Sequence, residues 1–290
     1  MALSLRELHR TTQPLLSPLA HDALSARLIK QAGFQTFNVG GSALLAARYA
    51  LPDLGLAGFG EMLAGLRDIV EATELPCLVD ADDGYGDVKS VVRTIQAYEA
   101  IGVSGVLLED QSREGKQPGA AAARNVVPIE VMEQKLKAAL AMRKSPDFVI
   151  IGRTDAYGAV GLDEALRRGE HFLKIGADGV FLAGLKTPVD YARVGKAFKG
   201  SWNAAAIFEG TATPWLAPSE LHAMGFSQIA YPNILIGRVA NAIETGLQRL
   251  SKLAAGDAKA FAGGEQELAL KSLADALELK TWNDLEKRFS

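Results

Sequence analysis

The acidic residues best suited to chemistry follow two neighbouring apolar segments. Asp80–Gly86 reads DADDGYG, and Leu108–Gln111 reads LEDQ. In an extended chain, positions 80 and 82 point to the same side. Carboxylates around one cavity repel each other unless a cation lies between them, and Mg²⁺ favours such oxygen ligands. We therefore predict a divalent-metal site at Asp80, Asp82 and Glu109, with an acidic surface turn as the alternative.

Two further features suit an anionic substrate. Arg153 can hold a carboxylate or a developing enolate oxygen with paired donors, and it could also form a structural ion pair with a neighbouring acid. The sequence Gly40-Gly41-Ser42 lets backbone N–H groups approach an anion closely, although such glycines are also ordinary turn residues. Asp53 is another acid, and the pattern alone assigns it no role.

The histidines and the single cysteine do not suggest a catalytic group. His9, His21, His171 and His222 lack metal-ligand spacing, and the last two fall in helical stretches where a surface position is expected. Cys77 lies in an apolar segment and is predicted to be a small buried hydrophobe. One cysteine excludes an internal disulfide, and no G-x-S-x-G motif is present.

The segments that must position these residues alternate between short apolar runs and longer helical stretches. Continuous apolar runs are typical of strands covered on both faces. Three helical stretches end at Gly33, Gly102 and Gly176, where a left-handed residue is favoured. Eight such units without a break predict a (β/α)8 TIM barrel, and an open doubly wound sheet is disfavoured because G-x-G-x-x-G is absent. The expected strands are Ser17–His21, Thr36–Val39, Pro76–Asp80, Gly105–Glu109, Phe148–Arg153, Gly179–Ala183, Asn203–Phe208 and Gln228–Tyr231.

The chain is predicted to have a catalytic barrel over residues 1–253 and a helical tail over residues 254–290. Ala254–Gly264 is rich in Ala and Gly and has the composition of a linker. Glu265–Leu279 and Trp282–Arg288 are the expected tail helices. A helical tail on a flexible linker often packs on the barrel or on a neighbouring subunit, so a homodimer or homotetramer is expected.

Composition excludes several partners. The 290 residues carry a formal net charge of −3, so no basic excess favours nucleic acid or an anionic membrane surface. No apolar run is long enough to span a bilayer, and the first residues lack the apolar centre of a secretory signal. We expect a cytoplasmic protein with a small-molecule substrate.

Together these segments resemble the isocitrate lyase/phosphoenolpyruvate mutase superfamily. The resemblance runs from about Ala20 to Leu250, and its strongest elements are the DADDGYG and GVLLEDQ segments, in the expected order with Leu51–Gly55 and Arg153–Ala156. Glu209 and Thr213-Pro214 look like the matching stretch of methylisocitrate lyases.

The resemblance implies a (β/α)8 barrel with Mg²⁺, or Mn²⁺, held at the acidic positions, in part through water. It also implies that the last helices are exchanged between paired subunits. The implied roles are metal binding for Asp80, Asp82 and Glu109; a catalytic role near metal and substrate for Asp53; substrate binding for Gly40, Gly41, Ser42 and Glu209; and both catalysis and substrate binding for Arg153. We further expect the far end of the pocket, which sets the choice of substrate, to be lined by Phe208, Trp215, Tyr231 and the substrate-binding Asn233.

One departure from the family pattern bears on function. Family lyases carry Lys-Arg-Cys-Gly-His on the loop after the fourth strand, where the cysteine is the catalytic acid; here the loop reads Lys116-Gln117-Pro118-Gly119-Ala120. Proline has no proton to give, so ordinary isocitrate or methylisocitrate cleavage is disfavoured. The order Gly40-Gly41-Ser42, in place of Ser-Gly-Gly, is also seen in oxaloacetate decarboxylases of this superfamily.

The sequence therefore predicts a Mg²⁺-dependent lyase that decarboxylates oxaloacetate or a close 2-oxo carboxylate. A retro-aldol lyase of a substituted malate or methylisocitrate-like acid is the runner-up, and it would need Tyr85 or a water as its acid. The same residues are also compatible with phosphonopyruvate mutase or hydrolase chemistry, and with a binding protein that has no turnover. Whether the loop over residues 112–125 forms an ordered lid stays open at this point.

Overall fold

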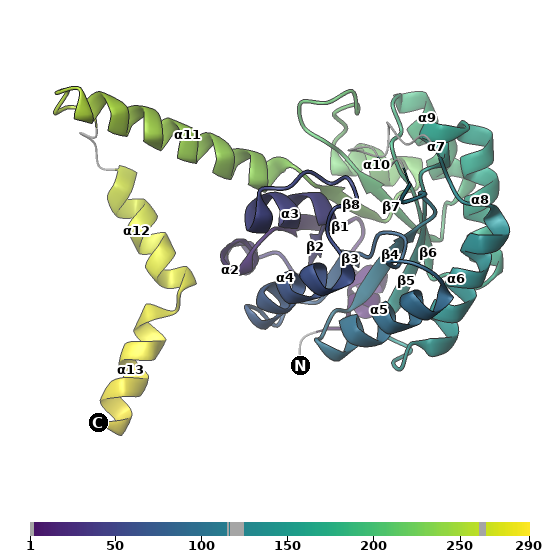
Figure 1. The fold of residues 1–290 in the computed structure, drawn as a ribbon, viewed down its shortest axis with the longest axis horizontal. Helices are drawn as coiled ribbons and strands as arrows, with labels where there is room; N and C mark the ends of the chain where they lie inside the picture. The colour runs from purple at the N-terminus through teal and green to yellow at the C-terminus, as the bar shows by residue number, and fades with distance from the viewer. Residues whose placement is uncertain (1–2, 115, 117–124, 261–264) are drawn as a thin grey trace.

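Eight parallel strands close into a barrel in chain order, with β1 beside β8 (Figure 1). The computed structural model describes residues 3–114, 116, 125–260 and 265–290. The predicted (β/α)8 fold is confirmed, and every expected strand is present within two residues of its predicted ends. The strands are β1 (Leu15–Ala20), β2 (Phe37–Val39), β3 (Cys77–Asp80), β4 (Gly105–Glu109), β5 (Val149–Thr154), β6 (Gly179–Leu182), β7 (Trp202–Ala206) and β8 (Gln228–Tyr231).

Helices surround the barrel and follow the strands. The glycines that end α2, α5 and α8 have φ values of 86°, 94° and 102°, which confirms the left-handed ends expected at Gly33, Gly102 and Gly176. The helices are α1 (Leu5–Thr11), α2 (Ala23–Gln31), α3 (Gly41–Tyr49), α4 (Phe59–Glu71), α5 (Val88–Ala100), α6 (Ile129–Met142), α7 (Ala156–Ala159), α8 (Leu162–Lys174), α9 (Pro188–Ala197), α10 (Pro218–Met224), α11 (Ile234–Ala254), α12 (Glu265–Ala276) and α13 (Leu279–Phe289).

The amino ends of the strands are closed by α1. Leu5 and Leu8 of α1 are buried in one apolar cluster with residues that begin β1 and β5, such as Leu15 and Val149. The ring of His9 stacks on Trp202 at the start of β7, with ring centroids 3.8 Å apart. This packing leaves the carboxyl ends of the strands as the mouth of the barrel, where the predicted site residues lie.

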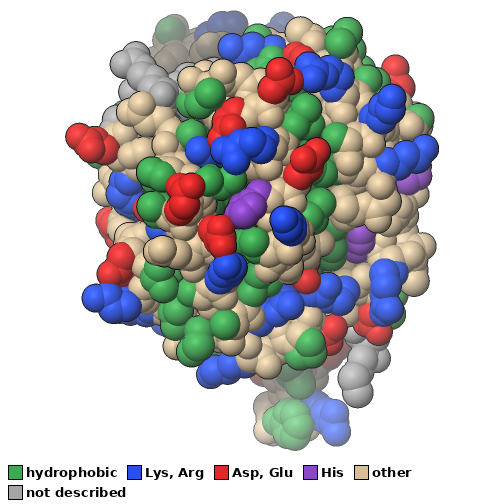
Figure 2. Space-filling model, turned by 90° about the vertical axis from the view of Figure 1, so that its right-hand side faces the viewer, with side chains coloured by type: hydrophobic (Ala, Val, Ile, Leu, Met, Phe, Trp, Pro, Cys, Tyr) green, Lys and Arg blue, Asp and Glu red, His purple; other side chains and the backbone are tan. Residues whose placement is uncertain are grey.

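The surface carries charges of both signs. Figure 2 shows acidic and basic side chains interspersed over the face that it presents, in keeping with the small net charge. Cys77 is buried in β3, as expected, and burial raises the pKa of its thiol to about 12. Among the described residues, no helix combines the length and apolar composition needed to cross a bilayer.

The long helix α11 extends away from the barrel and leads into the predicted tail of residues 254–290 (Figure 1). In the single chain, none of the residues of α11 is buried. The exposed residues of this helix include four large apolar ones, Val239, Ile243, Leu247 and Leu250. Their three- and four-residue spacing places them on one side of the helix. Trp282 and Phe289 of α13 are likewise exposed, at 62% and 77%. Apolar faces of this extent need a partner.

We expect a second copy of this chain to cover the apolar side of α11, so that the protein is a dimer or tetramer in solution. Ile243→Glu combined with Leu247→Glu should dissociate the assembly toward the 30.8 kDa monomer in light scattering after gel filtration. Thr245→Glu with Gln248→Glu, on exposed polar positions of the same helix, is the matched control. A monomeric wild-type protein at micromolar concentration would contradict the expectation.

Candidate functional site

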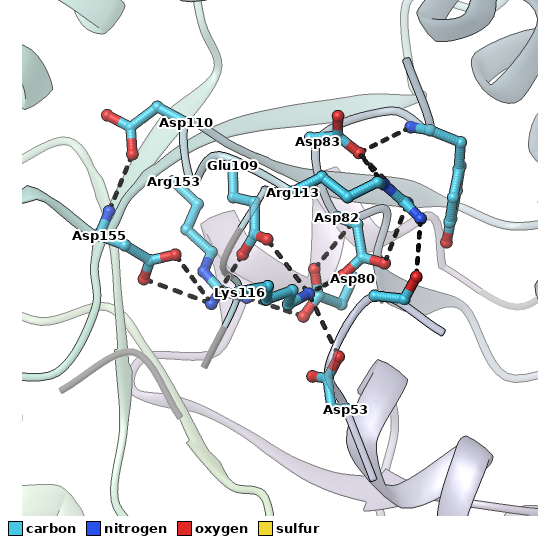
Figure 3. Close-up of polar contacts among 12 residues, drawn as sticks. Asp53, Asp80, Asp82, Asp83, Glu109, Asp110, Arg113, Lys116, Arg153 and Asp155 are labelled. Atoms are coloured by element: carbon cyan, nitrogen blue, oxygen red, sulfur yellow. Dashed lines mark hydrogen bonds and ion pairs between the residues drawn. The ribbon is translucent and has the colours of Figure 1, made fainter. Parts of the chain in front are cut away.

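Three carboxylates converge at the mouth of the barrel. Asp80 ends β3, Asp82 lies two residues beyond it, and Glu109 ends β4. Each offers a carboxylate oxygen, and these three oxygens lie within 4.8 Å of one another (Figure 3). Because neighbouring parallel strands end at the same edge, residues distant in the chain meet in one acidic cup. We use the term acidic cup for Asp53, Asp80, Asp82 and Glu109.

The local backbone, and not strand alternation, brings Asp82 to the cup. Asp82 has a φ of 47°, so the extended geometry assumed from the sequence is wrong at this position. Its N–H donates to Asp80 Oδ1 at 3.1 Å, and its carbonyl accepts from the Glu109 N–H at 2.9 Å. Gly84 allows this turn to lie close to α5, because a Cβ there would come 2.4 Å from Val91 Cγ2.

Lys116 extends its ammonium group into the cup. Its Nζ lies 2.6 Å from Asp82 Oδ1, 3.2 Å from Asp53 Oδ1 and 3.3 Å from Glu109 Oε1. Burial opposes the charged ammonium, but Glu109, Asp82 and Asp53 outweigh burial and raise the pKa of Lys116. The cup therefore attracts and holds a cation.

Arg153 lies on the other side of the cup, in β5 next to Glu109 of β4. Its Nη1 is 2.7 Å from Asp80 Oδ2, and its Nη2 is 2.8 Å from Glu109 Oε2. Asp155 contacts the same Nη2 at 3.2 Å. The structural ion pairs considered for Arg153 from the sequence are therefore present, while the side chain also lines the cavity.

Burial makes the acidic cup unfavourable for bare carboxylates. It raises the pKa of Asp80 and raises that of Glu109 well above the ordinary range, although Arg153 acts in the opposite direction on both. Glu109 Oε2 contacts Arg153 without accepting a hydrogen bond of normal geometry. The four carboxylates of the cup also outnumber the cationic side chains that contact them, which are Lys116, Arg153 and Arg113, whose Nη2 lies 3.9 Å from Asp82 Oδ2. The cup thus keeps an excess of negative charge, which favours a bound cation.

The donor set fits Mg²⁺. All three converging groups are carboxylates, the oxygen ligands that Mg²⁺ and Mn²⁺ accept, and a cationic nitrogen already lies within 3.3 Å of two of them. Asp80, Asp82 and Glu109 are therefore the residues that would hold the ion.

The first turn of α3 faces the cup. Gly40 precedes the helix, and Gly41 and Ser42 begin it without a side-chain cap on their N–H groups. A Cβ at Gly41 would lie 3.9 Å from Asp53 Oδ2 and from Asp82 Oδ1, so this backbone directly borders the acids. A helix N-terminus with uncapped N–H groups is suited to a carboxylate.

A cavity of about 130 Å³ opens beside the cup. This volume is well below the roughly 300–1,000 Å³ of clefts that hold drug-sized ligands, so the ligand must be small. The wall away from the acids comes from β6, β7, β8 and the residues that follow them, and it is apolar apart from Gln228 of β8. This apolar wall consists of Phe181, Ala183, Ala204, Ala205, Ala206, Phe208, Ala230 and Pro232.

Several residues predicted to contact substrate lie outside the cavity. Phe208 lines it, but Trp215 is 60% exposed and packs on Tyr231, with ring centroids 5.4 Å apart. Asn233 and Glu209 join the end of β7 to α11: the Glu209 N–H donates to Asn233 Oδ1 at 3.0 Å, and the Asn233 amide donates to the Glu209 carbonyl at 2.7 Å.

The carboxylate of Glu209 instead pairs with an arginine of α11. Arg238 Nη2 donates to Glu209 Oε1 at 3.1 Å, and both side chains are largely exposed in the single chain. Glu209 and Asn233 are thus not brought to the cup by the contacts of this chain.

Two site residues were missed in the sequence. Lys116 could have been found, because it matches the first lysine of the family's loop motif. Gln111 gave no signal: it is 3% exposed, lines the cavity, and its Oε1 has no hydrogen-bond partner among the described residues. Pro118 and Ala120–Ala123, on which the loop comparison rests, lie outside the described residues.

Comparisons with known proteins agree with this geometry. A family model described as phosphoenolpyruvate phosphomutase matches residues 5–251. The chain is 38% identical over 235 residues to 2,3-dimethylmalate lyase of Eubacterium barkeri, covering 81% of each protein. It resembles the structure of oxaloacetate acetylhydrolase in complex with the product oxalate, with a TM-score of 0.86, 26% identity and coverage of 99% and 96%. It also resembles phosphonopyruvate hydrolase in complex with oxalate and Mg²⁺, with a TM-score of 0.79, 27% identity and coverage of 95% and 94%.

Removing one carboxylate of the cup should weaken Mg²⁺ binding. Glu109→Gln is expected to lower the Mg²⁺ affinity at least about 10-fold in calorimetric titration. Loss of a residue that only hydrogen-bonds to a metal ligand already costs about 10-fold, and loss of the ligand itself should cost no less. Asp163→Asn, an exposed carboxylate paired with Arg193, is the matched control. Because burial raises the pKa of Glu109, protons should compete and the affinity should fall as the pH is lowered. An unchanged affinity in Glu109→Gln would refute the assignment.

Lys116 should compete with the metal. Lys116→Met removes a cation that lies between Asp82 and Glu109, so Mg²⁺ is expected to bind this variant more tightly than wild type in the same titration. Lys137→Met, a lysine on the exposed side of α6, controls for the change in net charge. Weaker binding by Lys116→Met would show that the ammonium does not occupy the position that the metal needs.

Proposed function

Since the chain belongs to the phosphoenolpyruvate phosphomutase family, we propose that it is a Mg²⁺-dependent carbon–carbon lyase that decarboxylates oxaloacetate or a close 2-oxo carboxylate. The observation that carries the proposal is the division of the cavity into an acidic side with its cations and an apolar wall. Among the described lining residues, Arg153 and Lys116 are the only cations, and both contact the acidic cup.

The acidic side would bind the 2-oxo end of the substrate. Held by Asp80, Asp82 and Glu109, Mg²⁺ would supply Lewis-acid polarisation of the 2-oxo group. The N–H groups of Gly41 and Ser42 are suited to the adjacent carboxylate. Arg153 can donate to the oxygen on which negative charge develops.

The apolar wall would receive the carboxylate that is lost. During decarboxylation the bond between C3 and C4 breaks, its electron pair forms the C2–C3 double bond, and the 2-oxo oxygen becomes the enolate oxygen. The leaving group changes from an anion to neutral CO₂. A wall such as Ala204, Ala205 and Phe208 offers no charge to hold the anion in place, so it favours the uncharged product over the reactant.

Protonation of C3 by water completes the reaction. Among the described residues that line the cavity, none is a histidine, cysteine or tyrosine. The hydroxyl of Tyr85, considered from the sequence as an acid, instead lies 3.0 Å from the Tyr98 hydroxyl, and burial raises its pKa well above the usual value. A reaction that needs no acid on the loop therefore agrees with proline at position 118.

Retro-aldol cleavage is the second candidate function. The 38% identity to 2,3-dimethylmalate lyase favours it, and the apolar wall could also accept methyl groups. This reaction leaves a carbanion on the half of the substrate away from the 2-oxygen, so its protonation would need water at that wall. The similarity to phosphonopyruvate hydrolase makes phosphonopyruvate a further compound to assay.

Purified protein with Mg²⁺ should release pyruvate from oxaloacetate faster than Mg²⁺ alone. Arg153→Lys should lower kcat by about 100- to 1,000-fold, the usual cost of losing a donor to a developing oxyanion. The exposed Arg193→Lys is the control. Pyruvate with propionate from 2,3-dimethylmalate, and no activity on oxaloacetate, would favour the retro-aldol candidate; phosphate from phosphonopyruvate in ³¹P NMR would favour the hydrolase.

A further inference from the structure

We propose that Arg168, a residue of α8 outside the cavity, positions Arg153 for the reaction through a buried chain of Asp110, Thr154 and Asp155. The inference rests on the proposed function only in the choice of substrate, because it concerns how the guanidinium of Arg153 is held.

The outer half of the chain joins Arg168 to the end of β5. Arg168 Nη1 donates to Asp110 Oδ2 at 2.9 Å. The same oxygen accepts from the Thr154 hydroxyl at 2.7 Å, and Asp110 Oδ1 accepts from the Asp155 N–H at 3.0 Å. Asp110, Thr154 and Asp155 are each fully buried. Both oxygens of Asp110 therefore fix the backbone and side chain that follow Arg153.

The inner half of the chain reaches the cavity. The carboxylate oxygens of Asp155 accept from Arg153 Nη2 at 3.2 and 3.3 Å (Figure 3). Arg153 in turn contacts Asp80 and Glu109 of the acidic cup. The direction of the Arg153 guanidinium thus depends on Asp155, whose own backbone N–H is held by Asp110.

Arg168 is itself held firmly at the outer end. Its Nε donates to Glu164 Oε1 and its Nη1 to the Val127 carbonyl, at 2.7 and 2.9 Å, and the residue is 6% exposed. The Val127 N–H donates back to the Asp110 carbonyl at 2.8 Å. These contacts fix the Arg168 guanidinium between Glu164 and Asp110.

Charge explains why Asp110 needs Arg168. Asp110 is fully buried, and Arg168 Nη1 contacts its carboxylate at 2.9 Å. Removing the cation from a buried ion pair is strongly destabilising. Without Arg168, the Asp110 carboxylate would lose a contact that holds it against Thr154 and the Asp155 N–H, and the restraint on Arg153 would loosen.

The neighbouring Arg167 supplies a matched control. It lies on the same helix and pairs with the same Glu164, but its side chain is 57% exposed, and its Nε and Nη2 both donate to that one carboxylate. Replacing either arginine removes one positive charge from α8. Of the two, Arg168 is the one that connects its charge to Asp110.

The test is a double-mutant cycle. Arg168→Met, Arg168→Lys and Arg167→Met are each made in the wild-type and in the Arg153→Lys background, and kcat and KM are measured with oxaloacetate and Mg²⁺. We expect Arg168→Met to lower kcat about 10- to 100-fold, as for residues that orient a functional group, with a smaller change in KM. Arg168→Lys should restore part of the loss, and Arg167→Met should match wild type.

The cycle separates positioning from a purely structural role. If Arg168 acts through Arg153, Arg168→Met should have little further effect in the Arg153→Lys background. Equal losses in both backgrounds, or a lower Tm with unchanged kcat, would overturn the proposal. Thr154→Val, which removes the hydroxyl that donates to Asp110 and accepts from the Ala156 N–H, replaces Arg168→Met if that variant does not fold.

Oxalate binding separates this inference from the proposed function. If wild-type protein does not act on oxaloacetate, the same cycle is measured as the Kd for oxalate with Mg²⁺ in calorimetry. A loss of oxalate affinity in Arg168→Met that disappears in the Arg153→Lys background would support the positioning role alone. Equal oxalate affinity in Arg168→Met and wild type would refute it whatever the substrate is.

Discussion

The acidic cup imposes the main physical constraint on this structure. Asp53, Asp80, Asp82 and Glu109 meet at the barrel mouth, and burial penalises the charged forms of Asp80 and Glu109. Such a group is tolerated only when cations are supplied, and the chain contributes Lys116 from the segment after β4 and Arg153 from β5. The rest of the mouth can be understood as the scaffold that holds these opposite charges at fixed distances.

Beyond the cup, the cavity gives the two ends of a small acid different surroundings. One end meets carboxylates, cations and the first N–H groups of α3, while the other meets the apolar wall. This asymmetry follows from which strands contribute. Charged residues stand at the ends of β3, β4 and β5, whereas β6, β7 and β8 bring small or apolar residues to the cavity, with Gln228 as the polar exception. In the proposed reaction, the polar half of the circumference would bind the 2-oxo end of the substrate and the apolar half would face the bond that breaks.

Much of this architecture could be predicted from the sequence, because apolar runs and helix-ending glycines are local signals. The gathering of Asp80, Asp82 and Glu109 followed from strands ending at one edge. Other features depend on contacts that no local pattern reveals. The left-handed backbone of Asp82 depends on its place between β3 and β4. The Glu209 carboxylate pairs with Arg238, which is 29 residues away in the chain. Lys116 matches the first lysine of the family's loop motif, but the motif does not predict that its side chain extends into the acidic cup.

Helix α1, which closes the amino ends of the strands, lies at the opposite end of the barrel from these charges. Leu5 and Leu8 are buried there, and no residue of the acidic cup belongs to their cluster. The folding free energy gained by burying α1 can offset the cost of crowding like charges at the mouth. The residues at the mouth can therefore change during evolution without changes at the α1 end. A scaffold with such a distant reservoir of stability tolerates changes of chemistry at its rim, which suits a lineage whose relatives include a lyase and hydrolases.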